Sequence, residues 1–570
     1  MTGTVLRDAR TAGKARGSSV GGAAYDMVAA TLADLGVEVA FSLVGSSNFR
    51  VVERLRSVHG VQYVWARHES GAVAMADGWA RASGKVGVAT LHQGPGLTNA
   101  LTPLVEAVKG RTPLLVVAGE TSTTDRGSSQ HVFQEGLVSA TGAAYRRVLR
   151  GETAAQATAE AWRQAVSERR PVVLGLPLDV QSEPCPTHGV IETAPAVARP
   201  VPRAEDIDRA CAMIRSAERP VLLAGRGAVE AEPELVSLAE ACGAVLATTA
   251  PAKGMFAGSP WSVGISGGFS SPLAQRLLPE SDLVISFGAS LTPWTTRHDE
   301  LIRHDVPLIA VNLDPVALSA HRPAQLALVG DSGATAVLMS RSLSGREQPE
   351  PRGYRAVVSA EDLADPGWNF TDESNDSGID PRTLMCALDR LLPPGRTLVA
   401  DSGQHIGWAP MHMNVTDPRG FVFTQSFMSL GLSLATGLGA SLARPSSLTV
   451  VVVGDGGLLM SLGELDSLIS QARHGAPILV VVIDDGAYGA EVHHFAPLGE
   501  STEIAEHGTR DFLGVATALG AQGCVVRSGE DLARSLPTWL SRPEGVFVLD
   551  CKINGAVVAH WAEEAFRSHA

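Results

Sequence analysis

Short apolar runs alternate with helix-like segments along most of this chain, and this alternation constrains its fold more than any other feature. In the first part of the chain the runs occupy 37–44, 86–91, 114–118 and 172–176. Apolar runs of this length indicate strands buried on both faces, and the segments between them can supply crossover helices. The pattern predicts a parallel sheet with helices on both of its faces.

The same pattern recurs twice, so the chain divides into three blocks. Strands are predicted in the second block at 220–224, 245–248, 283–287 and 308–312, and in the third at 397–400, 448–453, 478–483 and 546–550. We therefore predict an α/β protein with three doubly wound parallel-sheet domains. The predicted units are a disordered tail at 1–19, a first domain at 20–190, a central domain at 203–344, a linker at 345–380 and a last domain at 381–570.

Composition narrows the possible partners and compartment. The chain has 570 residues, of which 46 are basic and 60 acidic, for a net charge of −14. This negative balance argues against a nucleic-acid or anionic-membrane surface. The most apolar long stretch, 428–443, contains too much Gly and Ser to predict a membrane span. Six cysteines without a CxxC pair, and a polar 1–19 segment, predict a cytoplasmic protein.

The second block carries a weak nucleotide-binding signal. Gly225 and Gly227 follow its first predicted strand, and Asp314 follows its last. Such strand ends bind nucleotides in doubly wound folds, but tight turns also use glycine, so both interpretations remain open. A nucleotide-dependent dehydrogenase is disfavoured because no complete GxGxxG motif follows a strand.

The third block carries the strongest local signal. Its strand at 448–453 is followed by Gly454-Asp455-Gly456-Gly457, and its strand at 478–483 is followed by Asp484-Asp485-Gly486-Ala487-Tyr488. Adjacent parallel strands would bring Asp455 and Asp485 to one sheet edge, where carboxylates suit Mg²⁺. The glycines would let main-chain N–H groups approach a phosphate. Two ordinary acidic turns are the alternative, which the order and spacing of the two motifs disfavour.

These two motifs together resemble the signature of enzymes that depend on thiamine diphosphate. The first block agrees: 67–72 and 76–81 resemble the family's glutamate motif, and 94–99 matches its GPGxTN turn. In the third block, Gly403-Gln404-His405 with Trp408 resembles the diphosphate-side loop of acetolactate synthases. One departure is Asp484-Asp485 where the family usually has Asn-Asn, which adds negative charge beside the diphosphate and leaves the cation preference open.

The resemblance implies a pyrimidine-binding domain, a central domain and a diphosphate-binding domain, in that order. Glu69 would protonate the cofactor's aminopyrimidine ring, the Met428 carbonyl would hold its amino group, and Leu430 would support its bent shape. The implied diphosphate and metal residues are Gly403, Gln404, His405, Gly454, Asp455, Gly456, Gly457, Asp485, Ala487 and Tyr488. Asp455, Asp485 and the Ala487 carbonyl would be the ligands of Mg²⁺.

Other positions bear on specificity. Ser46 and His92 fall where benzoylformate decarboxylases have an active-site serine and histidine. Glu491 falls where pyruvate decarboxylases have a proton-relay glutamate, and His493 and His494 follow it. A lone histidine is more often structural than catalytic, so both interpretations stay open for each of these histidines.

The resemblance implies a lyase or carboligase that decarboxylates a 2-oxo acid to an enamine and then joins it to an aldehyde or oxo-acid acceptor, as acetolactate synthases do. A simple decarboxylase that releases an aldehyde is the first alternative. A flavin-dependent oxidase or a noncatalytic relative is another. FAD is not expected, because 289–298 has no convincing flavin signature, and Glu69 argues against a noncatalytic relative.

The predicted site is divided between domains. Glu69 lies in the first block and Asp455 in the third, and in this family the two meet across a subunit interface. The resemblance therefore implies a homodimer or homotetramer with shared sites.

Overall fold

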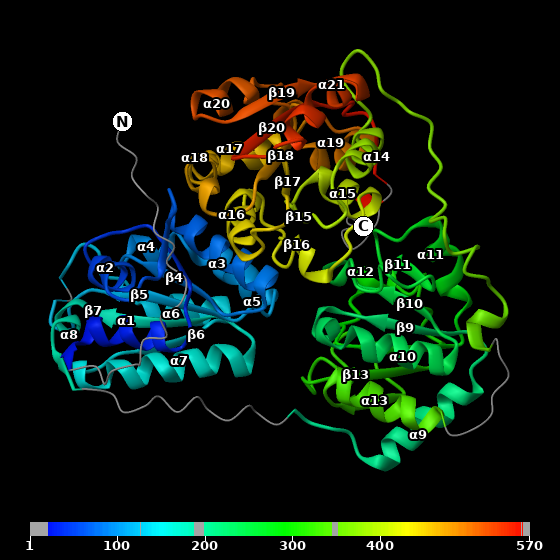
Figure 1. Ribbon diagram of the computed structural model, residues 1–570, viewed down its shortest axis with the longest axis horizontal. Coiled ribbons are helices and arrows are strands. Elements are labelled where there is room, and N and C mark those ends of the chain that lie inside the picture. The colour runs from blue at the N-terminus through cyan, green and yellow to red at the C-terminus, as the bar shows by residue number, and fades with distance from the viewer. Residues whose placement is uncertain (1–20, 126, 187–198, 345–351, 560, 563–570) are drawn as a thin grey trace, which may run out of the picture.

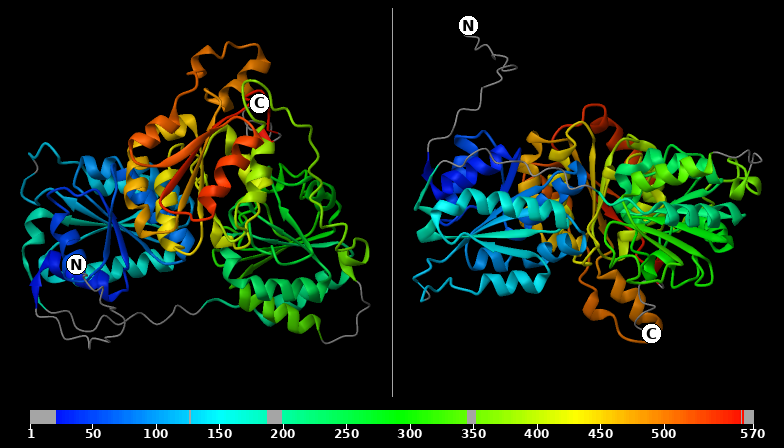
Figure 2. Two further views of the ribbon diagram at one scale, coloured as in Figure 1. Left: turned by 45° about the horizontal axis from the view of Figure 1, so that its top comes forward. Right: turned by 90° about the horizontal axis from the view of Figure 1, so that it is seen from below.

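Three α/β domains make up the computed structural model, which describes residues 21–125, 127–186, 199–344, 352–559 and 561–562 (Figure 1). The C-terminal domain lies between the N-terminal and central domains, and the two further views in Figure 2 show the same arrangement. Each domain is built on a six-stranded sheet in which every neighbouring pair of strands is parallel. The predicted fold class is confirmed.

The N-terminal sheet has the strand order β3-β2-β4-β5-β7-β6. Its strands are β2 (Val39–Ser42), β3 (Gln62–Trp65), β4 (Gly87–Leu91), β5 (Leu114–Glu120), β6 (Ala144–Arg147) and β7 (Val172–Pro177). The helices are α1 (Ala24–Asp34), α2 (Phe49–Ser57), α3 (Glu69–Ser83), α4 (Pro95–Thr98), α5 (Leu101–Lys109), α6 (Gln134–Thr141), α7 (Ala154–Glu168) and α8 (Leu178–Gln181). A short antiparallel pair, β1 (Gly22–Ala23) and β8 (Pro184–Cys185), joins the two ends of the domain.

The central sheet has the order β11-β10-β9-β12-β13-β14. Its strands are β9 (Pro220–Ala224), β10 (Val245–Thr248), β11 (Ser262–Ile265), β12 (Leu283–Phe287), β13 (Leu308–Asn312) and β14 (Leu326–Val329). The helices are α9 (Ala204–Ser216), α10 (Glu232–Cys242), α11 (Pro272–Leu277), α12 (Pro293–Thr296) and α13 (Ser332–Leu343).

The C-terminal sheet has the order β16-β15-β17-β18-β20-β19. Its strands are β15 (Thr397–Ala400), β16 (Phe421–Phe423), β17 (Thr449–Gly454), β18 (Ile478–Asp484), β19 (Gln522–Val526) and β20 (Val546–Lys552). The helices are α14 (Pro381–Leu391), α15 (Trp408–His412), α16 (Ser433–Ala443), α17 (Asp455–Met460), α18 (Leu462–Gln471), α19 (Gly489–Phe495), α20 (Phe512–Ala518) and α21 (Gly529–Leu540). Every residue of β17 and β18 is buried, because helices cover both faces of this sheet.

The N-terminal and C-terminal sheets have the same topology. Numbered along the chain within each sheet, both have the strand order 2-1-3-4-6-5, whereas the central sheet has the order 3-2-1-4-5-6. In the order 2-1-3-4-6-5, the chain adds strands on one side of strand 1 and then on the other, so strands 1 and 3 lie side by side where the winding reverses. These strands are β2 and β4 in the N-terminal domain and β15 and β17 in the C-terminal domain. Doubly wound sheets bind ligands at the carboxyl ends of the strands at such a reversal.

The N-terminal and C-terminal domains are joined by α3 and α16, which pack at close range. A side chain at Gly78 of α3 would collide with the Thr436 carbonyl, and one at Gly439 of α16 would collide with the Met75 carbonyl. Small residues at these crossings let the two main chains approach each other. As a result α16, and the loop that precedes it, are supported by the N-terminal domain.

No helix in the described ranges is both long enough and apolar enough to cross a membrane.

Candidate active site

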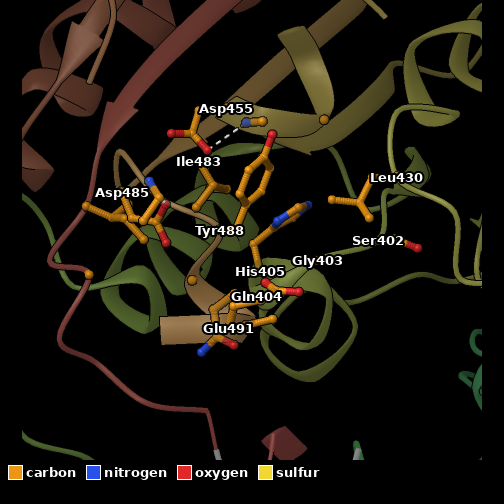
Figure 3. Close-up of a pocket in the computed structure, with 18 of the residues that line it drawn as sticks. Ser402, Gly403, Gln404, His405, Leu430, Asp455, Ile483, Asp485, Tyr488 and Glu491 are labelled. Carbon is orange, nitrogen blue, oxygen red and sulfur yellow. Dashed lines mark hydrogen bonds between the residues drawn. The ribbon is translucent and has the colours of Figure 1, made fainter. Parts of the chain in front are cut away.

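A cavity opens at the carboxyl ends of β15, β17 and β18 (Figure 3). Its walls come from the turns that follow these strands, from the start of α19 and from the segment after β20. The site residues predicted from the sequence that line it are Gly403, Gln404, His405, Leu430, Gly454, Asp455, Gly456, Gly457, Asp485, Ala487, Tyr488 and Glu491. In Figure 3, Asp455 and Asp485 lie on one side of Tyr488, with His405 and Leu430 on the other.

The turn after β17 needs glycine because neighbouring groups lie too close to its main chain to leave room for a side chain. A Cβ at Gly454 would lie 2.9 Å from the His405 ring, and one at Gly456 would lie 2.8 Å from the Tyr488 ring. At Gly457 it would lie 2.9 Å from a carboxylate oxygen of Asp401. Bare main chain therefore forms this part of the cavity wall, as a phosphate-binding turn requires.

Two carboxylates face this turn, of which Asp455 is buried and Asp485 is half-buried. The Asp455 carboxylate accepts hydrogen bonds from the main-chain N–H groups of Gly456 at 2.7 Å and Gly486 at 3.0 Å. Burial and the neighbouring Asp485 carboxylate raise the pKa of Asp455 to about 8. Burial also raises the pKa of Asp485 to about 6, although the hydrogen bond that its carboxylate accepts from the Ala487 N–H lowers this pKa. Crowded carboxylates with raised pKa values suit a divalent cation, which would neutralise them.

The extra carboxylate, Asp484, has its own counter-ion. Asp484 is in register with Lys552 on the neighbouring strand β20, and the Lys552 ammonium group binds its carboxylate. The same ammonium lies 2.8 Å from Asp550 and donates to the Arg510 carbonyl. The negative charge that the Asp-Asp pair adds is therefore compensated inside the protein by Lys552, which the sequence alone did not reveal.

Two polar atoms in the cavity wall have no partner in the described structure. They are His405 Nε2 and Gln404 Oε1, both buried. Burial lowers the pKa of His405 to about 4, so the ring is neutral near pH 7 and can offer one N–H. Because an unpaired buried polar atom costs about 1–3 kcal/mol, these atoms point to a polar ligand in the cavity.

The chemistry of this donor set fits a diphosphate held through a divalent cation. Asp455, Asp485 and the Ala487 carbonyl would supply oxygen ligands, and His405 with the glycine turn would face the phosphates. No group of three His, Cys, Asp or Glu side chains in the described residues is arranged to hold a metal by itself. A cation here would therefore need main-chain oxygen and the diphosphate to complete its coordination.

His493 ties three walls of the cavity together. Its Nδ1 accepts a hydrogen bond from the Gln404 amide at 3.1 Å, and its Nε2 lies 2.7 Å from the Gly555 carbonyl. The His493 ring thus links the turn after β15, helix α19 and the segment after β20. His494 stacks edge-on against Phe495 instead, at 4.7 Å between ring centroids.

The predicted specificity residues of the first block gather at the other chain reversal, between β2 and β4. His92 Nδ1 lies 2.8 Å from the hydroxyl of Ser47, which also accepts the Gln93 N–H at 3.0 Å. Ser47 is 1% exposed, whereas the predicted Ser46 is exposed beside it. Ser47 was missed because nothing in the sequence says which of two adjacent serines points inward.

Glu69 is the first residue of α3 and lies close to the group formed by Ser47 and His92. Its carboxylate accepts a hydrogen bond from the Asn99 amide at 3.0 Å, so the GPGxTN turn orients it. Among the residues that the structure describes, none from the N-terminal domain lines the cavity around Asp455. Within one chain, therefore, the structure does not bring Glu69, Ser46 or His92 to the predicted metal ligands.

Of the remaining predicted residues, Met428 does not line the cavity, whereas Glu491 does. Met428 has a φ of +61° and its side chain is 71% exposed, and Leu430, two residues on, lines the cavity. Glu491, in the first turn of α19, lines the cavity with its side chain exposed to solvent.

Comparison with known proteins agrees with this geometry. Three domain models of thiamine pyrophosphate enzymes match in order: the N-terminal TPP-binding domain at 23–142, the central domain at 207–339 and the C-terminal TPP-binding domain at 401–551. The acetolactate synthase of Mycobacterium leprae is 29% identical over 521 residues, 88% of this chain and 82% of that protein. The sulfoacetaldehyde acetyltransferase of Rhodobacter capsulatus is 29% identical over 531 residues, covering 88% and 89%. The large subunit of acetolactate synthase isozyme 2 of Escherichia coli is 28% identical over 536 residues, covering 91% and 93%. With its three domains in this order, the chain belongs to the thiamine-diphosphate-dependent enzyme family.

Proposed function

We propose that this protein is a thiamine-diphosphate- and Mg²⁺-dependent carboligase that takes an acyl group from a 2-oxo acid and joins it to an aldehyde or a second oxo acid. The observation that carries the proposal is the cavity in which Asp455, Asp485 and His405 meet around a glycine turn. The name of one relative, acetolactate synthase, denotes formation of an acetohydroxy acid and supports carboligation, and the name sulfoacetaldehyde acetyltransferase denotes acetyl transfer.

The residues of the cavity would bind and orient the cofactor. Asp455, Asp485 and the Ala487 carbonyl would hold Mg²⁺, and the His405 N–H would face the diphosphate. When bound, thiamine diphosphate supplies the nucleophilic carbon and accepts the electrons released when a 2-oxo acid loses CO₂. The Met428 carbonyl and the Leu430 side chain would set the angle between the two rings of the cofactor.

Glu69 would hold a proton at the far nitrogen of the pyrimidine ring, with Asn99 keeping the carboxylate in place. Because Glu69 does not line the cavity of its own chain, we propose that it serves the cavity of a second copy in a homodimer or dimer of dimers. Exposed apolar side chains near the cavity support such an interface. They are Phe427 (43% exposed), Met428 (71%), Leu459 (44%) and Met460 (57%).

Glu491 would donate or accept a proton in the later steps. Its place at the cavity entrance, in the first turn of α19, is compatible with this role. A second subunit that covers the entrance would exclude water from it and strengthen its interactions with substrate.

A panel of 2-oxo acids, assayed with and without acceptors, tests the function. Pyruvate, 2-oxobutanoate and benzoylformate are each incubated with the holoenzyme alone, with an aldehyde and with a second oxo acid, and the products are identified by mass. We expect a 2-hydroxyketone or acetohydroxy acid that forms only when cofactor and Mg²⁺ are both present. Sulfoacetaldehyde is included because one relative is named sulfoacetaldehyde acetyltransferase. Glu69→Gln provides the inactive control, and product formation independent of added cofactor would contradict the proposal.

A simple decarboxylase is the second candidate, and one observation favours it. The hydrogen-bonded pair of His92 and Ser47 lies at a chain reversal, where it could hold a substrate carboxylate or carbonyl. Under this alternative, benzoylformate yields free aldehyde even when acceptors are present. His92→Ala and Ser47→Ala would then both slow aldehyde release. Ser46→Ala, at the adjacent exposed serine, is the matched control.

A further inference from the structure

The loop between β16 and α16 is held from outside its own domain. The Glu106 carboxylate, on α5 of the N-terminal domain, accepts the main-chain N–H of Ser426 at 3.1 Å and that of Phe427 at 2.6 Å. Arg81, on α3, donates to the Phe423 carbonyl at 2.8 Å. Two helices of the N-terminal domain thus bind the main chain at the end of β16 and at Ser426 and Phe427 in the loop.

The groups that hold the loop form a buried charged cluster. Arg81 lies 2.9 Å from both the Asp77 and the Glu106 carboxylates, and all three side chains are at most 7% exposed. A buried carboxylate with a guanidinium and two N–H donors is well satisfied, and hydrogen bonds to charged groups are stronger than neutral ones. The cluster is therefore a rigid anchor for the loop.

The far end of the loop has a second anchor. The Asp401 carboxylate accepts the Gly431 N–H at 3.0 Å and the Ser402 N–H at 2.9 Å. The segment between the two anchors contains Met428, whose φ of +61° is costly for a side chain of this kind. Backbone strain of this kind persists only where the surroundings impose it.

We propose that Glu106 is a positioning residue that holds Met428 and Leu430 in the geometry that the bound cofactor needs. This inference rests on the proposed function, in which these two residues shape the cofactor. Met428 follows Phe427 directly, so a shift of the Phe427 N–H moves the Met428 carbonyl with it. Neither Glu106 nor Arg81 lines the cavity, so their effect passes through the loop.

Glu106→Gln changes the anchor with almost no change in size. The amide has one carbonyl oxygen, so its NH₂ group would face either the Ser426 N–H or the Phe427 N–H, donor against donor. The charge that pairs with Arg81 is lost as well. Glu106→Asp retains the charge with a shorter reach and serves as a second variant if the first does not fold. Glu168→Gln, an exposed glutamate on α7 paired with Arg170, is the matched control.

The first measurement is hydrogen exchange on the cofactor-free protein. In Glu106→Gln we expect the Ser426 and Phe427 amides to exchange about 10- to 100-fold faster. The amides of β5 should exchange as in the wild type, and Glu168→Gln should change neither region. Unchanged protection at Ser426 and Phe427 would overturn the anchor, whatever the enzyme catalyses.

The second measurement tests positioning of the cofactor. Thiamine diphosphate and Mg²⁺ are the probes, and we record the cofactor dissociation constant and, at saturation, the exchange rate of the thiazolium C2 proton. We expect weaker binding and C2 exchange slowed at least 10-fold in Glu106→Gln, with part of the rate retained in Glu106→Asp. A loosened loop with normal C2 exchange at saturation would overturn the inference. Wild-type protein that does not bind thiamine diphosphate would instead refute the proposed function, while the exchange result at Phe427 would still decide the anchor.

Discussion

Replacing Lys552 with methionine tests the idea that one ammonium group neutralises the extra acid beside the predicted metal site. Lys552 is 8% exposed at its side chain and binds two carboxylates, Asp484 and Asp550, whose side chains are fully buried. Burial lowers the pKa of Lys552, but its hydrogen bonds to the two carboxylates outweigh burial, so the net shift is upward and the group is charged at pH 7. Methionine fills similar space without charge. Removing one partner of a buried ion pair costs about 3–5 kcal/mol, because the other partner stays buried and unpaired.

Hydrogen exchange in β18 measures this cost locally, which suits a protein of several domains. A loss of 3–5 kcal/mol would speed exchange of the β18 and β20 core amides about 150- to 4,000-fold. The triple variant Asp484→Asn, Asp550→Asn, Lys552→Met removes all three charges together and should recover most of the protection. Single-variant exchange within 5-fold of wild type at pH 7 would refute the reasoning, since the buried carboxylates would then not need the ammonium group of Lys552.

The remaining predictions concern the cation, the proton transfer and acid stability. Asp455→Ala should lose Mg²⁺ and thiamine diphosphate together, since in the proposed site the ion would link the diphosphate to protein; stoichiometric cofactor that survives dialysis against a chelator would contradict this. Glu491→Gln should slow product formation by about 10²–10⁴-fold while C2 proton exchange stays normal, because under the proposal that exchange would depend on Glu69; equal slowing of both would remove Glu491 from the later steps. Burial lowers the pKa of His412 to about 4 from its ordinary 6.5, so the unfolded chain binds a proton between these values that the folded protein excludes. Its contribution to stability is complete above pH 6.5 and falls by about 3 kcal/mol as the pH drops to 4, and His412→Leu should lose this acid sensitivity in thermal scans from pH 7 to 4.5.

The apolar runs predicted the interior of every sheet and missed its edges. The four predicted strands of each block are the four inner strands of its sheet, such as β15, β17, β18 and β20. Within the three six-stranded sheets, the strands that the runs did not predict are the outermost ones: β3, β6, β11, β14, β16 and β19. An inner strand of a covered parallel sheet must be apolar on both faces, whereas an edge strand keeps polar residues, as β6 does with Arg146 and Arg147.

In the candidate site, too, the features set by residues close together in the sequence were predictable, and those set by distant residues were not. The glycine turn with Asp455, and the acidic turn with Asp485, were predictable because each is a short motif at the end of a buried strand. The two turns lie close together because they follow neighbouring parallel strands, and the strand pattern in the sequence already predicted that these strands are neighbours. The choice of Ser47 over Ser46 as the partner of His92 was not predictable, because it depends on the direction of one side chain at the end of β2.

Sequence alone thus determined the class of fold, the inner strands and the motifs that we propose bind a diphosphate and a cation, since these depend on residues close together along the chain. Only the tertiary structure decided that Lys552 neutralises Asp484 and that Glu106 holds the Phe427 N–H. These partners are 68 and 321 residues apart in the chain. The two groups of each pair come within hydrogen-bonding distance only because a strand pairing or a helix packing brings them together. A buried charge needs a partner in space, and no spacing along the sequence states where that partner will be.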